Sequence, residues 1–553
     1  MHRLDALFLR LAAGPRALAG AALVALTLVL CLPGFLALPP VDRDEASFAQ
    51  ASRQMYATGD YVDIRLHDAP RHKKPVGIYW LQAAAVAVTG GNGADVIATY
   101  RAVSLAAAVL SVLLTWGIGT RLAGPLPGFF AALMVAACFI LGAEARLAKT
   151  DAVLLATVLA AQAVLARLWM EPGRPLPRRA ALGFWAALAV STLVKGPVGP
   201  MVVALTAGAL TLAERRAGWL LALRPGAGLA LFLALVTPWY VAITLRTDGA
   251  FWAASLGGDL LGKVAQGEEG HGAPPGSFLV SLWLSFWPSA LILALSLPAI
   301  WAARNSRASL FCIAWAVPGW IVFELVPTKL LHYMLPLFPA LAILAAAGWM
   351  QTAAPLGSWW RRLAAGAILA VPFLLLAGLT WGARAIGAAV PPDFAFAAAG
   401  LAAASWLTWR AIRRGFVALP FAGLALLSLA LSAGVYPGLA RVEALWPSSA
   451  ASRVLARFDG CAAPLVVSSG YGEPSMVFQT RRDILLLPGA EAAVAVAAAP
   501  CALAFVSDAE LAAFEESMRR LAPPAPAQAA GRIEGVNIGS GRRVRLTIFE
   551  RRP

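Results

Sequence analysis

Long apolar runs, separated by short charged or Pro/Gly-rich breaks, recur along most of the chain. A helix needs about 20 mostly apolar residues to span a bilayer. The pattern therefore predicts thirteen transmembrane helices, over residues 16–38, 97–120, 125–144, 150–170, 180–194, 197–213, 221–244, 276–301, 309–326, 331–350, 361–382, 392–411 and 416–436.

Two apolar segments near the N-terminus need separate interpretation. Residues 76–89 are too few to span a bilayer and lie between Lys73-Lys74-Pro75 and Gly90-Gly91, which favours an interfacial or re-entrant segment. Residues 16–38 are too long for a signal-peptide core and run into Pro39-Pro40, a poor cleavage context. We interpret them as a retained first span.

Charged loop residues indicate the orientation of the spans. With thirteen spans and a cytoplasmic N-terminus, basic clusters such as Arg178-Arg179, Arg215-Arg216 and Arg361-Arg362 all fall inside, as the positive-inside rule requires. A fourteenth span at 76–89 would move them outside. The pattern thus predicts a multi-pass protein of the bacterial inner membrane whose C-terminus is periplasmic.

Composition agrees with a lipid environment. Hydrophobic residues make up 60% of the chain and charged residues 13%, and the mean hydropathy is +0.72. Loop arginines that meet anionic lipid head groups account for the net charge of +16, so nucleic acid is not an expected partner. All six lysines fall in outer-side segments. This bias indicates either phosphate-binding sites or loops that are less constrained by topology.

The chain changes character near residue 445. Strand-like runs begin at Leu465, Asp483, Leu503 and Arg543, and residues 508–521 have a helical pattern. We therefore predict a transmembrane domain over 1–440, with its first periplasmic loop and juxtamembrane helices at 41–96, and a small periplasmic α/β domain over 441–553. Cys461 and Cys501 each precede a strand-like run, so the sequence leaves open whether they form a disulfide.

The first outer loop carries most of the candidate chemistry. An amphipathic helix is predicted from Asp44 to Gly59, lying on the membrane surface. Asp44 is either its N-cap or a carboxylate that acts as a general base at the mouth of a cavity. The following segment, 63–75, gathers six basic side chains, which suits a phosphate-bearing lipid or anionic head groups in general.

Five motifs in this order resemble a known superfamily, that of lipid A aminoarabinose transferases and protein O-mannosyltransferases. They are Asp44-Glu45 followed by Gly59-Asp60, Lys74-Pro75 and Tyr79-Trp80; Arg146 to Thr150-Asp151; Lys195-Gly196-Pro197; His271 to Pro274; and Thr328-Lys329 followed by Tyr333 and Pro336.

The resemblance implies an all-α polytopic membrane protein with the C-type glycosyltransferase fold. It implies transfer of a sugar from a polyprenyl-phosphate donor to a lipid or glycan acceptor on the periplasmic side, with membrane lipids as surroundings. Asp44 would be the catalytic carboxylate and Asp151 a second acidic group. The donor phosphate would be bound by Lys74, Lys329 and Tyr333, with Arg71 beside them, and Glu45, Arg146, Lys149 and His271 would be secondary site residues.

The chain departs from this pattern at one place. Aminoarabinose transferases usually carry an aromatic and an acidic residue just before the position of Lys74, where this chain has Arg71, His72 and Lys73. Lys73 in its cationic state cannot ligate a metal, so a divalent metal is not assignable and no cofactor is expected with certainty. A flippase of polyprenyl-linked sugars is the alternative function, although a transporter should place ionisable groups near the midplane or on both faces.

Overall fold

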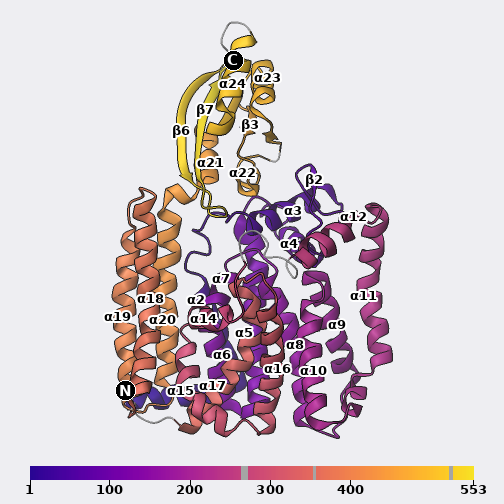
Figure 1. The fold of residues 1–553 in the computed structure, drawn as a ribbon, viewed down its shortest axis with the longest axis vertical. Coiled ribbons are helices and arrows are strands. Elements are labelled where there is room, and N and C mark those ends of the chain that lie inside the picture. Colours follow the sequence, from indigo (N-terminus) through magenta and orange to yellow (C-terminus); the bar gives the residue numbers. More distant parts are fainter. Residues whose placement is uncertain (263–271, 353–356, 482, 522–526) are drawn as a thin grey trace.

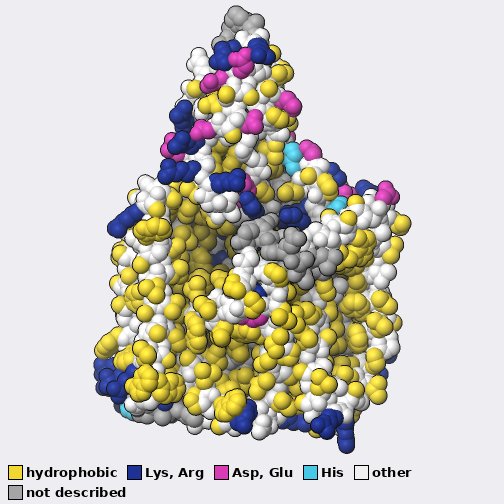
Figure 2. Space-filling model, in the orientation of Figure 1, with side chains coloured by type: hydrophobic (Ala, Val, Ile, Leu, Met, Phe, Trp, Pro, Cys, Tyr) yellow, Lys and Arg dark blue, Asp and Glu magenta, His cyan; other side chains and the backbone are white. Residues whose placement is uncertain are grey.

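Helices make up most of this computed structural model, which describes residues 1–262, 272–352, 357–481, 483–521 and 527–553. Figure 1 shows a bundle of helices with a β-sheet standing on one end and the N-terminus at the opposite end. Hydrophobic side chains cover the flank of the bundle in Figure 2, and Lys and Arg gather at the end that carries the N-terminus and on the sheet. This distribution is typical of a protein that crosses a bilayer.

Seven helical segments of the described chain are long and apolar enough to span a membrane, and nine are if two bent pairs each count as one span. The chain is therefore a multi-pass membrane protein. The bent pairs are α1 (His2–Ala13) with α2 (Arg16–Cys31), and α14 (Ser277–Ser285) with α15 (Ala290–Ala302). The seven are α5 (Ile97–Ala123), α8 (Asp151–Met170), α11 (Pro225–Arg246), α16 (Arg307–Leu325), Leu331–Gln351, α18 (Trp359–Ala385) and α20 (Leu419–Arg441).

The sequence predicts thirteen transmembrane helices, which is more than the seven to nine candidate spans of the described chain. Four further predicted segments are helical, but none is both long and apolar enough to be counted by the same measure. They are α6 (Pro125–Ala137), α9 (Arg178–Lys195), α10 (Val198–Glu214) and α19 (Pro392–Arg413). The first span is also shorter than predicted, because α2 ends at Cys31 and α1 meets it at 112°. Pro15 lies at this break, where it cannot continue a helix.

Two helices of the first outer loop lie between the bundle and the sheet. α3 (Asp44–Thr58) confirms the predicted helix and ends at Gly59, whose φ of +70° is a common helix stop. Most residues of α3 are buried, and α3 contacts α4 (Gly77–Val88) and α22 (Pro474–Gln479). Its expected position at the membrane surface stays a prediction. The first residue of α3 is Asp44, and Arg43 is the N-cap instead.

The C-terminal residues form a five-stranded mixed sheet in the order β4-β3-β5-β7-β6. The strands are β3 (Leu465–Ser469), β4 (Leu485–Leu486), β5 (Ala502–Ser507), β6 (Gln528–Val536) and β7 (Arg543–Arg551). β3 is parallel to β4 and β5, whereas β7 is antiparallel to β5 and to β6. Apolar side chains of both sheet faces are buried, one against α21 (Pro447–Arg457) and the other against α23 (Gly489–Ala498) and α24 (Asp508–Arg520).

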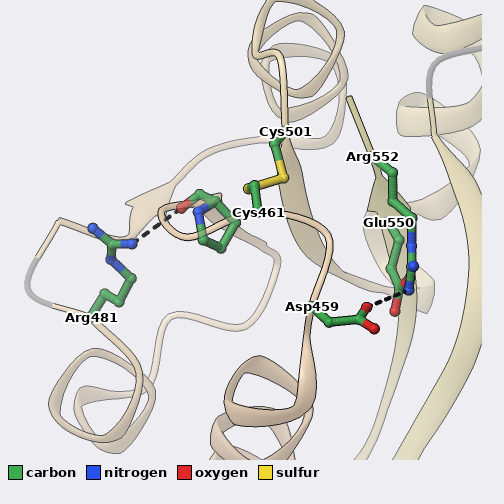
Figure 3. The surroundings of a disulfide bond; sticks show 7 residues. Asp459, Cys461, Arg481, Cys501, Glu550 and Arg552 are labelled. Carbon is green, nitrogen blue, oxygen red and sulfur yellow. Dashed lines mark hydrogen bonds and ion pairs between the residues drawn. A yellow bond between two sulfur atoms is a disulfide. The ribbon is translucent and has the colours of Figure 1, made fainter.

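A disulfide joins Cys461 to Cys501, just ahead of β5 (Figure 3), with an S–S distance of 2.06 Å. Cys31, Cys138 and Cys312 are free and buried. A disulfide requires an oxidising compartment such as the periplasm. Arg552 binds both Asp459 and Glu550 beside it, so the chain end is tied to the same region.

Alkylation of the purified protein tests this assignment. Denatured, unreduced protein should take up three alkyl groups, and reduced protein five, because only the three buried cysteines are thiols. Changing both Cys461 and Cys501 to serine should lower the free energy of unfolding of the sheet by about 2–4 kcal/mol, as is usual for a native disulfide. Five alkyl groups without reduction would contradict the pairing.

Candidate functional site

Glu45 and Arg101 anchor the floor of the first outer loop. The Arg101 guanidinium, fully buried on α5, donates from Nε to Glu45 Oε1 at 2.7 Å and from Nη2 to Oε2 at 2.8 Å. Its remaining bonds go to the carbonyls of Phe35, Leu38 and Pro39. Glu45 also accepts from the backbone N–H groups of Val41 and Ala148. Both oxygens of the Glu45 carboxylate thus accept hydrogen bonds from Arg101 and from the backbone, and these bonds position the segments on either side of Asp44.

A polar cavity of about 380 Å³ opens above this anchor. Asp44 lies on its wall at the start of α3, exposed to the cavity rather than capping the helix. Six charged or polar side chains from four other segments also line the cavity, namely Lys73, Lys74, Lys149, Asp151, Lys195 and Tyr333. The structure therefore brings Asp44, Asp151, Lys74, Lys149, Tyr333 and Arg71 together, as predicted from the sequence order.

A cluster of buried charges forms one end of the polar cavity. Lys195 Nζ donates to Asp151 Oδ1 at 2.5 Å, and Lys149 Nζ lies 3.2 Å from Glu144 Oε1 and 4.0 Å from Asp151 Oδ2. His332 spans both carboxylates, with Nδ1 3.6 Å from Glu144 Oε1 and Nε2 3.7 Å from Asp151 Oδ1. Asp151 is therefore held in ion pairs, which leaves Asp44 as the carboxylate better placed to accept a proton.

Glu144, Asp151 and His332 also have the donor atoms of a metal site, all within 4.8 Å of one another. One oxygen, Glu144 Oε2, is buried without a hydrogen-bond partner. Two ammonium groups nevertheless already compensate these carboxylates, and a divalent cation at this point would lie against both of them. The cluster does not fit a metal ion as it stands, so no chemical step is assigned to one.

Only part of the basic segment 63–75 reaches the polar cavity. Arg71, Lys73 and Lys74 line it, and the Arg71 guanidinium lies 5.0 Å from the centre of the Phe48 ring. Arg65 instead pairs with Asp63 at 3.3 Å, and the buried His72 binds the other oxygen of Asp63 at 2.8 Å. This segment therefore directs three of its cations toward the cavity and uses the others to fold the loop.

A second, apolar cavity of about 320 Å³ adjoins the first. Residues of α10, α11 and α16 form its walls, among them Met201, Tyr240 and Val322. Six residues line both cavities: Lys73, Lys74, Asp151, Lys195, His332 and Tyr333. Lysines therefore lie where an apolar space meets a polar one, an arrangement that suits a lipid with a phosphate head group.

Three candidate residues lie elsewhere. Lys329 Nζ donates to the carbonyl oxygens of Phe323, Glu324 and Val326 at the end of α16, so binding a phosphate would require it to leave them. Arg146 is fully buried, donates to carbonyls of Leu30, Pro33 and Gly142, and does not line the polar cavity. His271 lies outside the described residues.

The predicted site residues did not include Lys73, Lys195, His332 or Glu144, although Lys73 belongs to the basic segment 63–75 and Lys195 to the Lys195-Gly196-Pro197 motif. Lys195 had a signal, because it is one of only six lysines in an arginine-rich chain. His332 lies next to Tyr333 within a motif that was singled out, but nothing in the sequence places it beside Asp151. Glu144 ends the short helix α7 (Phe139–Glu144), where no pattern distinguishes it.

The C-terminal part contacts α3 and the segment just before it through hydrogen bonds at two points. Asp42 accepts from Ser475 N at 3.0 Å and from Ser475 Oγ at 2.6 Å. Arg53, buried on α3, donates to the carbonyls of Val477 and Phe478 and pairs with Asp95 at 2.9 Å. The helix that begins with Asp44 is therefore held by the bundle below and by α22 above.

Burial raises the pKa of Asp42 from 3.8 to about 6, with help from nearby Glu473 and against the Ser475 hydrogen bonds. Because the folded pKa is the higher one, the folded state holds this proton more tightly than the unfolded chain. This contribution to stability is complete below pH 3.8 and is lost as the pH rises through about 6. Asp42→Asn should remove this pH dependence of the stability. The difference in thermal midpoint between wild type and variant should therefore change between pH 4 and pH 7. Parallel plots of thermal midpoint against pH would contradict the prediction.

Comparison with known proteins gives matches over parts of the chain. Residues 73–241 match the family model described as dolichyl-phosphate-mannose-protein mannosyltransferase. An undecaprenyl phosphate-alpha-4-amino-4-deoxy-L-arabinose arabinosyl transferase of Edwardsiella ictaluri is 27% identical over 60% of this chain, and one of Pectobacterium carotovorum is 26% identical over 62%. The alignments cover 58% and 64% of those relatives, which is less than two thirds of their length.

The fold has a counterpart among solved structures. ArnT from Cupriavidus metallidurans in the apo state superposes with a TM-score of 0.71 at 19% identity, covering 95% of this chain and 97% of ArnT. The structure of the same protein bound to undecaprenyl phosphate gives 0.70 at 20% identity. The chain is therefore a multi-pass membrane protein with the fold of ArnT. The chain is thus similar to protein mannosyltransferases over residues 73–241 and to aminoarabinose transferases over about 60% of its length, the superfamily that its motifs resemble.

Proposed function

We propose that the chain transfers a sugar from a polyprenyl-phosphate donor to the hydroxyl or phosphate oxygen of a lipid or glycan acceptor. The observation that carries this proposal is the pair of joined cavities, one apolar and one polar, with Lys73, Lys74, Lys195 and Tyr333 at their junction. A polyprenyl chain fits the first cavity and a sugar the second, and the phosphate then lies among the cations. The named relatives transfer aminoarabinose from undecaprenyl phosphate.

The proposed reaction is a displacement at the anomeric carbon of the sugar. Asp44 accepts the acceptor proton while the acceptor oxygen bonds to this carbon. The bond between the carbon and the phosphate oxygen breaks, and its electron pair stays on the carrier phosphate. The ammonium groups of Lys74 and Lys195 and the Tyr333 hydroxyl stabilise that developing charge, which is how phosphate leaving groups are generally assisted. Asp151 holds Lys195 in place for this role.

We further propose that thirteen helices cross the inner membrane, with the N-terminus in the cytoplasm and the C-terminus in the periplasm. Residues 1–440 would then be the transmembrane glycosyltransferase domain and 441–553 a periplasmic domain. Arginine-rich loops favour the cytoplasm, and the Cys461–Cys501 disulfide favours the periplasm for the sheet. In this topology the two cavities open at the periplasmic side.

Binding of undecaprenyl phosphate to the purified protein in nanodiscs tests the donor site. Lys74→Ala should weaken binding about tenfold or more, since a hydrogen bond to a charged group contributes roughly 1.5–3 kcal/mol. Arg65→Ala is the matched control, because Arg65 belongs to the same loop but pairs with Asp63. Equal affinities for wild type and Lys74→Ala would argue against the assigned donor site.

A further inference from the structure

Asp44 lies between two carboxylates that are each fixed by hydrogen bonds. Glu45, one residue after it, is bonded to Arg101 of α5 and to backbone N–H groups. Asp42, two residues before it, is bonded instead to Ser475 of the C-terminal part of the chain. Because Asp44 itself is exposed, the direction of its carboxylate depends on the backbone that these two neighbours hold.

A chain of three buried hydroxyl groups stands behind Asp42. Ser475 Oγ donates to Asp42 Oδ2 at 2.6 Å, so it accepts from its other neighbour, Ser448 Oγ, which also lies at 2.6 Å. Ser448 Oγ in turn lies 3.3 Å from the hydroxyl of Tyr471, which then donates to it. All three hydroxyl donors therefore point along the chain toward the Asp42 carboxylate, and hydrogen bonds in such a chain strengthen one another.

The three hydroxyls belong to the folded core of the C-terminal part. Ser448 lies on α21, Ser475 lies on α22, and Tyr471 follows β3. The carbonyl of Tyr471 accepts from Ser468 Oγ of β3 at 2.6 Å, and its ring packs in the apolar core on the α21 face of the sheet. The C-terminal sheet and its helices therefore fix the point to which Asp42 is bonded.

α22 also contacts the middle of α3. Arg53 of α3 donates to the carbonyls of Val477 and Phe478, and its guanidinium lies 4.8 Å from the centre of the Phe478 ring. That ring is buried in an apolar cluster with Ala49 of α3 and with Ala148. Figure 1 shows α22 at the end of the C-terminal part that faces the bundle. α3 therefore cannot shift relative to α22 without breaking these contacts.

We propose that Ser475 is a positioning residue for sugar transfer. Together with Ser448 and Tyr471 it holds Asp42, and the backbone of Asp42 then directs the Asp44 carboxylate toward the acceptor oxygen. This inference deepens the proposed function and rests on it. It gives the C-terminal part a role in the rate of the chemical step and none in donor binding, because the proposed phosphate contacts belong to other segments.

Ser475→Ala tests the proposal, because it removes the hydroxyl that bonds to Asp42 and keeps the backbone N–H. The matched control is Ser449→Ala. Ser449 donates to Gln479 Oε1 at 2.7 Å, so it also joins α21 to α22, but it is not part of the hydroxyl chain. Tyr471→Phe removes only the hydroxyl farthest from Asp42 and is the milder second variant.

Each full-length variant in nanodiscs is given a membrane-extracted pool of polyprenyl-phosphate sugars at saturation, with lipid A as acceptor. Ser475→Ala should lower the rate of transfer about 10- to 100-fold, since a misplacement of about 1 Å at the reacting group has an effect of this size. Tyr471→Phe should lower the rate less, and Ser449→Ala should stay near the wild-type rate. Affinity for undecaprenyl phosphate should be unchanged in all three variants.

A double variant separates positioning from a general loss of structure. In an Asp44→Asn background, Ser475→Ala should lower the rate no further, because it acts through Asp44. Equal losses in both backgrounds overturn the positioning role and leave the proposed function standing, and so do equal rates for Ser475→Ala and Ser449→Ala. If Ser475→Ala does not fold, the same two comparisons are made with Tyr471→Phe.

Failure of the proposed function has a different signature. Wild type that transfers no sugar to lipid A or any other lipid of the membrane extract contradicts the function itself. Full activity of Asp44→Asn overturns the positioning role together with the assignment of the general base, since Ser475 would then have no base to position.

Discussion

Asp44→Asn should lower the rate of sugar transfer by about 10²–10⁴-fold, which is the usual contribution of a positioned general base. The substitution removes the exposed carboxylate at the start of α3, whereas Asp151 stays engaged with Lys195 and Lys149 and cannot replace it. The rate is measured as product formed by purified protein at saturating donor. Affinity for undecaprenyl phosphate should change little, because the proposed phosphate contacts are Lys74, Lys195 and Tyr333 and not Asp44.

Asp68→Asn is the control for this substitution. Asp68 lies on the same outer loop, and its side chain is 97% exposed and pairs with His67. Its loss should leave transfer near the wild-type rate. Full activity of Asp44→Asn would exclude Asp44 as the base, and equal losses in both variants would point to a general effect of charge on the loop.

Arg101→Leu should have the largest effect on stability. It leaves the buried Glu45 carboxylate without its cation and three carbonyls without their donor. Breaking a buried ion pair from one side typically costs about 3–5 kcal/mol. Thermal unfolding of the detergent-solubilised protein should therefore shift to a markedly lower temperature, and transfer activity should fall with it because Glu45 positions the segments around Asp44.

Another arginine of α5 provides the control for Arg101→Leu. Arg121, near the other end of α5, pairs with Glu171 at 3.2 Å where both side chains are partly exposed. A surface pair of this kind contributes roughly 0–1 kcal/mol, so Arg121→Leu should leave the unfolding temperature almost unchanged. Similar shifts for the two variants would show that the Arg101 contacts do not anchor the loop.

Apolar patterning predicted where helices lie better than how many cross the membrane. Helices occur at each predicted span because the apolar runs are long and uninterrupted, but bends and short helices at 1–31, 125–144 and 276–301 depend on local prolines and packing. In the C-terminal part, β3, β5 and α24 follow their patterns. The strand β6 was not predicted, since most of its side chains are exposed and its sequence is rich in alanine and glycine.

The candidate site was likewise only partly predictable from the sequence. The motifs predicted that Asp44, Lys74, Asp151 and Tyr333 belong to one site, and the four residues line one cavity. The ion pairs of the site could not be predicted from the sequence. Lys195 and His332 contact Asp151 from 44 and 181 positions away, and no local pattern encodes such a contact. The saturated environment of Glu45 likewise depends on Arg101, which lies within an otherwise apolar span.

Transfer by the purified full-length protein tests the central claim most directly. Wild type in nanodiscs is given a membrane-extracted pool of polyprenyl-phosphate sugars with lipid A as acceptor, and the lipids are analysed by mass spectrometry. The proposed function predicts a sugar-bearing acceptor together with an equal amount of free polyprenyl phosphate. If the donor stays intact while the protein, in sealed vesicles, moves it across the bilayer, the chain is a flippase and the transferase account is wrong.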